Sequence, residues 1–341
     1  MAKFRKIQPF TWLLLVLVLL LFAGLLGVLL SDSPARTEAL AAVSADAAET
    51  PDASENEDPA EMPEWIRPAE PEPETVQEKE PPEGELTAAE ILSGAQVIAH
   101  GMGAMEGVAT LNCLEGFQQQ YERGVRVFEA DLRLTSDMQV VLRHDWRAGW
   151  QAGISETSIP SLEAFLNRPI LEQYTPLSFQ DLLLLMEEYP DICIITDTKF
   201  TDAEIVTLQF EAMLSDAEEL GLSYLFDRMI IQVYSQLMYT VVDNIHHFSN
   251  YIYTLYAEGF GRTEDAFREI ASFCGENDIL GITMWDYWWD ASYLPIAQEC
   301  GVDVFAHTVN DAQEALSLLD SGISAVYTDT LTPGNLTGIT E

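Results

Sequence analysis

Short apolar runs alternate with amphipathic segments through most of this chain, and this alternation limits its fold more than any other feature. It extends over about 250 residues from Thr87 to the C-terminus, which is the usual size of a TIM barrel. The apolar runs have the length of buried β-strands and cover residues 95–99, 125–132, 192–196, 229–233, 251–255, 279–284, 302–307 and 324–328. Eight strand–helix units predict a parallel sheet closed into a TIM-type (β/α)8 barrel.

An open doubly wound sheet is the alternative fold for the same alternation. That fold usually carries a Gly-rich phosphate loop after its first strand, and no such loop follows residues 95–99. A further short strand at 140–145 would be the ninth. We interpret it as a hairpin-like extension near the barrel mouth.

Two of the amphipathic segments carry clear helix-end signals. The segment 112–124 ends on Gly124, which we interpret as its C-cap. The segment 178–190 opens with Ser178 as N-cap and has Asp181 three residues later, the spacing of a capping box. Both segments are therefore expected to form helices that follow or precede a strand.

The N-terminal residues 1–30 predict a membrane anchor. Lys3, Arg5 and Lys6 precede an uncharged stretch from Phe10 to Leu30 that is long enough to span a bilayer. The positive-inside rule places the N-terminus in the cytoplasm, so we expect a single-pass protein of the cell membrane with its remaining domain extracytoplasmic. A signal peptide cleaved near residues 41–48 is the alternative, although its apolar region would normally be shorter.

Residues 31–86 predict a disordered linker between the anchor and the barrel, which begins at residue 87. The segment is rich in Glu, Asp, Pro and Ala and has too few large apolar residues to offset the entropy of ordering. The whole chain has a formal net charge of −40, which argues against a nucleic-acid partner. Its four cysteines have no metal-ligand spacing and are expected to be core residues, with one disulfide as the alternative.

Polar and charged side chains follow several of the predicted strands at the point where each strand ends. In a barrel these positions gather at the C-terminal face, where active sites lie. Side chains two residues apart on a strand point to the same face, so pairs such as Glu129 with Asp131 should converge. The candidate site comprises His100, Glu129, Asp131, His144, Asp197 and Lys199.

These residue types suit metal-assisted acid–base chemistry on a phosphate ester. Carboxylate oxygens of Glu129, Asp131 and Asp197 favour Ca²⁺ or Mg²⁺ over zinc. His100 and His144 are suited to transfer protons to and from the reacting oxygens. Lys199 and the metal would neutralise the phosphoryl group.

Other histidines and a group of aromatic residues are less clearly functional. His246 and His247 lie in a segment that we interpret as a helix end, and we expect them to be surface residues. His307 ends a late strand, where it lines the mouth or only fills it. Among the aromatic residues of 284–290, Trp285 is nearest the strand end and is the candidate apolar wall for the organic part of a substrate.

On these segments the sequence resembles the glycerophosphodiester phosphodiesterase family, among the phospholipase-C-like barrel phosphodiesterases. The similar region runs from about Ala95 to Pro333, and the segment 128–145 (FEADLRLTSDMQVVLRHD) is its most distinctive part. Further matching segments are AHG at His100, NCLEGF at Asn112, ITDTK at Asp197 and the closing segments 307–311 and 325–333.

The resemblance implies a role for each matched residue. His100 and His144 become the acid–base pair, Glu129 and Asp131 become metal ligands, and Asp197 takes the third ligand position, where the family usually has Glu. Asn112 becomes a substrate contact. In that family a substrate hydroxyl attacks phosphorus and a cyclic phosphate is then opened by water.

The sequence also departs from the family pattern. Gly101 follows His100 where the family typically has an arginine, and Leu111 precedes Asn112 where a glutamate is common. The resemblance therefore implies a phosphoric diester hydrolase acting on glycerophosphodiesters or lipid headgroup phosphodiesters. A catalytically inactive barrel that binds an extracytoplasmic ligand or partner is the alternative.

Overall fold

The computed structural model describes residues 76–82, 84–257 and 259–337. The predicted membrane anchor at 1–30 and the predicted linker up to residue 75 lie outside these residues. Within the described ranges, no helix combines the length and apolar character that crossing a membrane requires.

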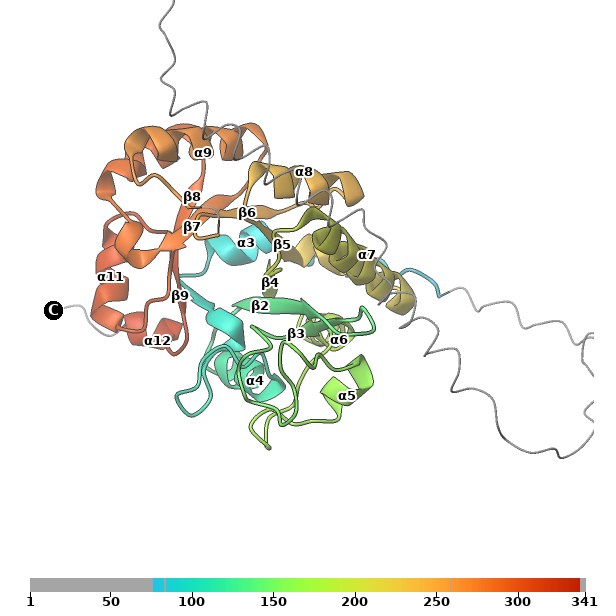
Figure 1. Cartoon of the computed structure of the whole chain (residues 1–341). Coiled ribbons are helices and arrows are strands. Elements are labelled where there is room, and N and C mark those ends of the chain that lie inside the picture. The colour runs from blue at the N-terminus through green and yellow to red at the C-terminus, as the bar shows by residue number, and fades with distance from the viewer. Residues whose placement is uncertain (1–75, 83, 258, 338–341) are drawn as a thin grey trace, which may run out of the picture. The chain divides into compact units, whose positions relative to one another are not determined.

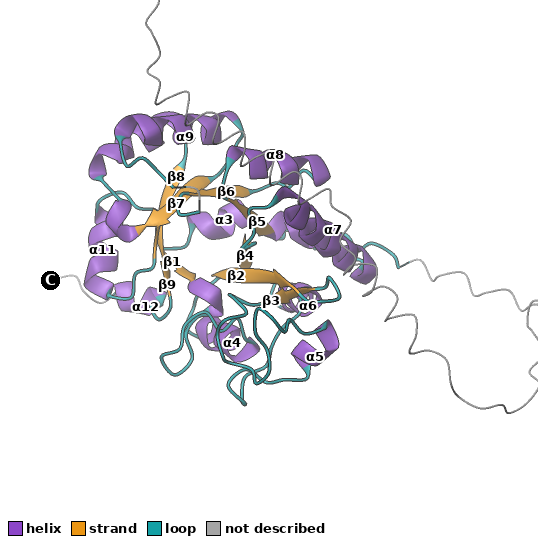
Figure 2. Cartoon of the chain, in the orientation of Figure 1, coloured by secondary structure: helices purple, strands orange, loops and turns teal. Residues whose placement is uncertain are grey.

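The described residues form a ring of strands surrounded by helices (Figures 1 and 2). The strands are β1 (Val97–Ala99), β2 (Val127–Leu134), β3 (Val140–Leu142), β4 (Cys193–Asp197), β5 (Met229–Val233), β6 (Tyr251–Thr254), β7 (Gly281–Trp285), β8 (Asp303–His307) and β9 (Ala325–Thr328). The helices are α3 (Ala88–Ser93), α4 (Leu114–Glu122), α5 (Leu162–Leu166), α6 (Phe179–Glu188), α7 (Ala203–Leu220), α8 (Gln236–Ile245), α9 (Glu264–Glu276), α10 (Leu294–Cys300), α11 (Ala312–Asp320) and α12 (Pro333–Leu336).

The sheet closes into a parallel barrel, as the alternation predicted. β1 pairs in parallel with both β9 and β2, and each remaining barrel strand pairs in parallel with its neighbours. β3 is different because it pairs antiparallel to the end of β2, with Leu132 opposite Leu142. This geometry confirms both the barrel and the hairpin-like extension.

The core has two layers on either side of the strands. One apolar cluster fills the space between strands and outer helices and includes Phe128, Ile194 and Phe210. A smaller cluster lies inside the barrel, where Ile98 and Ile195 meet residues of α3. Because both strand faces are covered, the strands are continuous apolar runs rather than alternating ones.

One predicted helix end lies where we expected it, and the other is displaced by one residue. Ser178 caps α6 and forms a capping box with Asp181. At the end of α4 the C-cap is Arg123, and Gly124 follows it with φ of 93°, a left-handed conformation that suits glycine. The difference is one residue.

Some residues of the predicted linker contact the barrel. The Lys79 N–H donates to the Gly221 carbonyl oxygen at 2.9 Å. Farther along, Glu85 Oε1 lies 2.6 Å from the Nε of the buried Arg228. Lys79 and Glu85 therefore contact the domain that we expected to begin at residue 87.

The cysteines are unpaired in the structure. Cys113, Cys193 and Cys274 are buried and Cys300 is half-buried. This agrees with their predicted role as core residues.

Candidate active site

The predicted site residues converge at the carboxyl ends of the barrel strands. A cavity of about 330 Å³ opens there. Its lining includes His100, Glu129, His144, Asp197, Lys199 and Trp285, together with Gln232, Tyr256, His307, Thr308 and Tyr327. Lys199 is the one lysine or arginine among the described residues that line it.

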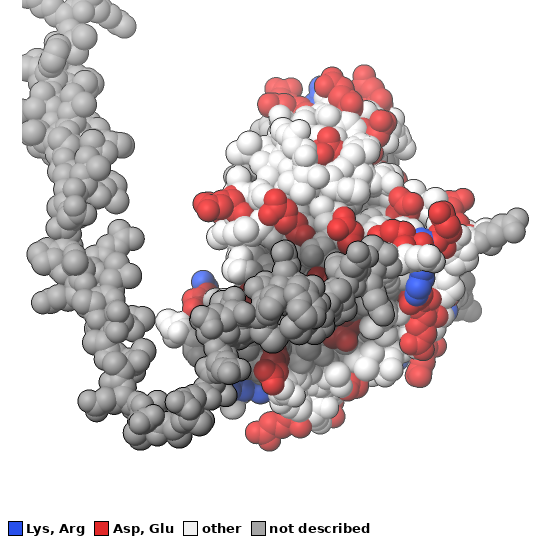
Figure 3. Space-filling view, turned by 90° about the vertical axis from the view of Figure 1, so that its right-hand side faces the viewer, with Lys and Arg blue, Asp and Glu red and all other residues white. Residues whose placement is uncertain are grey.

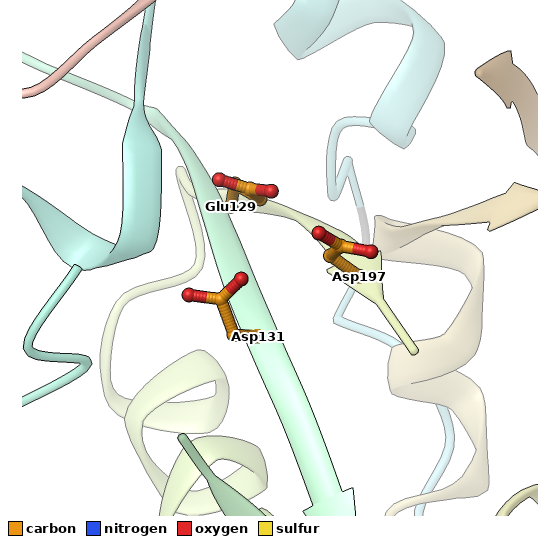
Figure 4. Close-up of side chains that lie close together, drawn as sticks. All are labelled: Glu129, Asp131 and Asp197. Carbon is orange, nitrogen blue, oxygen red and sulfur yellow. The ribbon is translucent and has the colours of Figure 1, made fainter. Parts of the chain in front are cut away.

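Three buried carboxylates form a candidate metal centre at this cavity. Glu129 and Asp131 come from β2, and Asp197 comes from the end of β4 (Figure 4). The register places Asp131 directly opposite Asp197. One oxygen from each carboxylate lies within 4.8 Å of the others, and all three side chains are buried. Hard oxygen donors at this spacing fit Ca²⁺ or Mg²⁺.

Lys199 lies within the same cluster. Its ammonium nitrogen is 2.7 Å from Asp131 Oδ1 and also contacts Asp197. Burial acts to lower the pKa of Lys199, but the attraction of Asp131 and Asp197 outweighs it and raises the pKa well above its ordinary value. The lysine is therefore a permanent cation beside the carboxylates.

Two tyrosines hold Asp197 in place. The Tyr234 hydroxyl donates to one carboxylate oxygen, and the Tyr256 hydroxyl donates to the other at 2.9 Å. Burial alone would raise the pKa of Asp197, but Lys199 and these hydrogen bonds hold it well below its ordinary value. Asp197 stays ionised as a result. Sequence reasoning missed both tyrosines although they follow the ends of β5 and β6, because a tyrosine after a strand is common without such a role.

Glu129 is held differently. Its Oε2 accepts a hydrogen bond from the Gly101 N–H at 3.1 Å. Burial raises its pKa, and the attraction of His100 partly opposes this shift. A bound cation would favour the ionised form, so this carboxylate suits a metal ligand.

His100 is oriented by a carboxylate from the other end of the chain. Its Nδ1 lies 2.8 Å from Asp329 Oδ1, and its Nε2 is 3.6 Å from Glu129 Oε2. Burial opposes protonation, yet these carboxylates raise the pKa of His100 to about 9. Asp329 follows β9 in the sequence TDT, and its role was not predicted. Its position directly after a strand was the available signal.

His144 lies beyond β3, at the cavity wall. Its Nδ1 is 3.0 Å from Asp145 Oδ2, and about a third of its side chain is exposed. The neighbouring Arg143 is fully buried and hydrogen-bonds within the segment 145–151, facing away from the site as expected. The two histidines thus line one cavity from the segments that follow β1 and β3.

Asn112 does not line the cavity. It is fully buried, donates from Nδ2 to Asp131 Oδ2 at 2.6 Å, and accepts from the Asp131 N–H at 2.9 Å. The structure therefore assigns it contacts that position Asp131, where the resemblance implied contact with substrate. Its backbone is left-handed, with φ of 52°, and neither this conformation nor the burial of the side chain was evident from the sequence.

The remaining histidines and aromatic residues fall into two groups, those that line the cavity and those that lie elsewhere. His246 and His247 are exposed, as predicted. Trp285 lines the cavity, whereas Trp288 packs on Phe260 and Trp289 packs on Tyr293. The open question about His307 is resolved, since it also lines the cavity.

Solved structures with this barrel include several phosphodiesterases. A phosphodiesterase from Oleispira antarctica, solved with the product sn-glycerol-3-phosphate, matches with a TM-score of 0.56 and 18% identity over 69% of this chain and 93% of that one. The fold is that of glycerophosphodiester phosphodiesterases.

Two further structures support the same assignment of fold. A candidate glycerophosphodiester phosphodiesterase from Galdieria sulphuraria matches with a TM-score of 0.59 and 17% identity over 71% of this chain and 95% of that one. A glycerophosphodiester phosphodiesterase from Parabacteroides distasonis matches with a TM-score of 0.53 and 17% identity over 69% and 92%. No family model matches the sequence, and no curated protein matches it. The similarity to the phosphodiesterase barrels is therefore one of structure.

Proposed function

We propose that this protein is a metal-dependent phosphoric diester hydrolase. The observation that carries the proposal is one cavity at the carboxyl ends of the barrel strands that is lined by Glu129, Asp197, Lys199, His100 and His144, with Asp131 buried beside the two carboxylates. The shared fold with glycerophosphodiester phosphodiesterases supports it. The expected substrates are glycerophosphodiesters or lipid headgroup phosphodiesters.

The proposed chemistry divides between the histidines and the cationic groups. One histidine removes a proton from the attacking hydroxyl, and the other protonates the leaving alcohol, in a route through a cyclic phosphate. Asp329 and Asp145 hold the imidazole rings through their Nδ1 atoms. Lys199 lies where it can contact a phosphoryl oxygen.

Glu129, Asp131 and Asp197 would hold Ca²⁺ or Mg²⁺. When bound, the ion supplies Lewis-acid stabilisation of the phosphoryl oxygens. The cation is useful here because the protein is strongly acidic. Asp and Glu side chains are scattered over the face in Figure 3 and outnumber the Lys and Arg side chains visible there.

The proposed location is the outer side of the cell membrane, anchored by residues 1–30. The basic residues before the apolar stretch 10–30 support this orientation. The test is protease protection in intact cells. Digestion of the barrel by an external protease is the expected result, and protection until lysis would contradict it.

A substrate panel tests the activity. Glycerophosphodiesters, phosphatidylinositol, lysophospholipids and glycerol-phosphate polymers are incubated with the full-length protein, with Ca²⁺ or Mg²⁺ and with chelator. We expect hydrolysis of at least one class that chelator abolishes and metal restores. Ligand binding without turnover at saturating metal would instead support the inactive-barrel alternative, which the missing arginine after His100 favours.

A further inference from the structure

His307 has a polar atom in the cavity for which the described residues provide no partner. The residue ends β8, and its side chain is more than nine-tenths buried. Its Nδ1 lies 3.0 Å from Thr283 Oγ1, whereas its Nε2 is buried without a hydrogen-bond partner among the described residues. Leaving such an atom unpaired costs stability, so a bound ligand is a reasonable partner.

The surroundings of His307 are aromatic. Its ring centroid lies 4.5 Å from that of Trp285 and 5.0 Å from that of Tyr256. Tyr256 also joins this region to the metal centre, because its hydroxyl donates to Asp197 at 2.9 Å. His307 is therefore placed to contact the organic part of a substrate whose phosphate is bound beside Asp197 and Lys199.

The imidazole of His307 is neutral at ordinary pH. Burial, together with the nearby charge of His100, lowers its pKa to about 3. A neutral ring offers at Nε2 either one hydrogen-bond donor or one acceptor, depending on which way the bond to Thr283 runs. A hydroxyl group can satisfy either form. A phosphate oxygen can only accept, and an ammonium group can only donate.

We propose that His307 is a specificity-determining residue whose Nε2 binds a hydroxyl group of the substrate's alcohol, while the carbon skeleton packs against Trp285. The ligand class is an aliphatic polyol phosphodiester with a free hydroxyl beyond the one that attacks phosphorus. This inference rests on the proposed function, since it concerns the same cavity. It gives His307 a role that is separate from proton transfer and from metal binding.

Two matched substrates test the proposal. One is a glycerol 1-phosphodiester, and the other is the corresponding 1,2-propanediol 1-phosphodiester. Both have the hydroxyl next to the phosphate-bearing carbon, but only glycerol has a second free hydroxyl. The wild-type protein is expected to prefer the glycerol substrate by about tenfold in kcat/KM, as for one buried hydrogen bond.

Variants then assign the preference to His307. His307→Phe keeps an aromatic ring without polar atoms and is expected to reduce the preference to about one- to twofold. His307→Gln keeps a donor and an acceptor and is expected to retain most of it. His247→Phe, the same exchange at an exposed surface residue, should change nothing. If the Phe variant does not fold, His307→Leu makes the same comparison.

Calorimetric binding of sn-glycerol 3-phosphate and 1,2-propanediol 1-phosphate separates this inference from the proposed function. In one outcome, no diester is cleaved, wild type binds sn-glycerol 3-phosphate more tightly than 1,2-propanediol 1-phosphate, and His307→Phe binds the two equally. This outcome would contradict the proposed hydrolase function and support the hydroxyl subsite at His307. If diesters are cleaved and wild type shows no preference in rate or binding, the subsite is refuted. Equal loss on both substrates in His307→Phe would also refute it.

Discussion

Lys199 and Asp131 form a buried ion pair in which the ammonium nitrogen lies 2.7 Å from Oδ1. The same nitrogen contacts Asp197, so the lysine occupies space between two of the candidate metal ligands. A cation of the protein thus offsets the repulsion among the three carboxylates when no metal is bound. This relationship predicts how stability and metal binding respond to the loss of the lysine.

Lys199→Met should destabilise the metal-free protein by about 3–5 kcal/mol, because it leaves buried carboxylates without their cation. The remaining negative charge should attract a divalent ion more strongly. We therefore expect Mg²⁺ or Ca²⁺ to raise the melting temperature of the variant more than that of wild type. Thermal unfolding with and without metal measures the rise in melting temperature. An equal rise in the variant and in wild type would show that Lys199 does not compete with the ion.

Asn112→Gly should weaken metal binding by about 10–100-fold, because Asn112 fixes the orientation of Asp131 through two hydrogen bonds. Glycine tolerates the left-handed backbone at this position and so limits other effects. Calorimetric metal titration is the measurement. A raised KM with unchanged metal affinity would favour the substrate contact that the resemblance implied.

Gly101→Ala should destabilise the protein by at least about 1 kcal/mol. Gly101 has φ of 51°, and an added Cβ would lie 2.5 Å from Thr110 Cα. The family's arginine therefore cannot be restored at this position without moving the backbone that donates to Glu129. Gly107→Ala is the matched control, since Gly107 also has positive φ but its Cβ would meet nothing within 4 Å. Denaturant unfolding should show a larger decrease in the free energy of unfolding for Gly101→Ala than for Gly107→Ala. Equal decreases would contradict the steric explanation.

The neutral state of His307 predicts a pH effect on stability. Its pKa is about 3 in the folded protein and near 6.5 when unfolded, so unfolding takes up a proton between these values. The stability of wild type relative to His307→Phe should be constant above pH 6.5 and fall below it, by up to about 1.4 kcal/mol per pH unit. Urea unfolding at pH 4.5 to 7.5 measures the difference, and parallel curves would mean that His307 is not buried as a neutral ring.

The sequence was sufficient for the barrel because its strands are buried on both faces. Each is then an apolar run, and the run 229–233 coincides with β5. The two-residue period of a strand also predicted that Glu129 and Asp131 face the same side. The end of the following predicted strand indicated Asp197 and Lys199 as candidate site residues. These predictions need only local geometry.

Other features depend on contacts that local patterns do not contain. Tyr234, Tyr256 and Asp329 reach the site from distant segments, and a Tyr or Asp after a strand is common without such a role. The resemblance implied a substrate contact for Asn112, and neither its left-handed backbone nor its hydrogen bond to Asp131 leaves a mark in the sequence. Tertiary packing of distant segments, and not the local sequence pattern, therefore decides which residues position the site.

The most direct test of the account compares wild type with His100→Ala and His144→Ala in the hydrolysis of a glycerophosphodiester at saturating metal. Metal titration measures the affinity of each variant for the ion. We expect either change to lower kcat by about 10²–10⁴-fold, and we expect the metal affinity of His144→Ala to stay near that of wild type. Hydrolysis that survives both changes, or that continues in chelator, would contradict it.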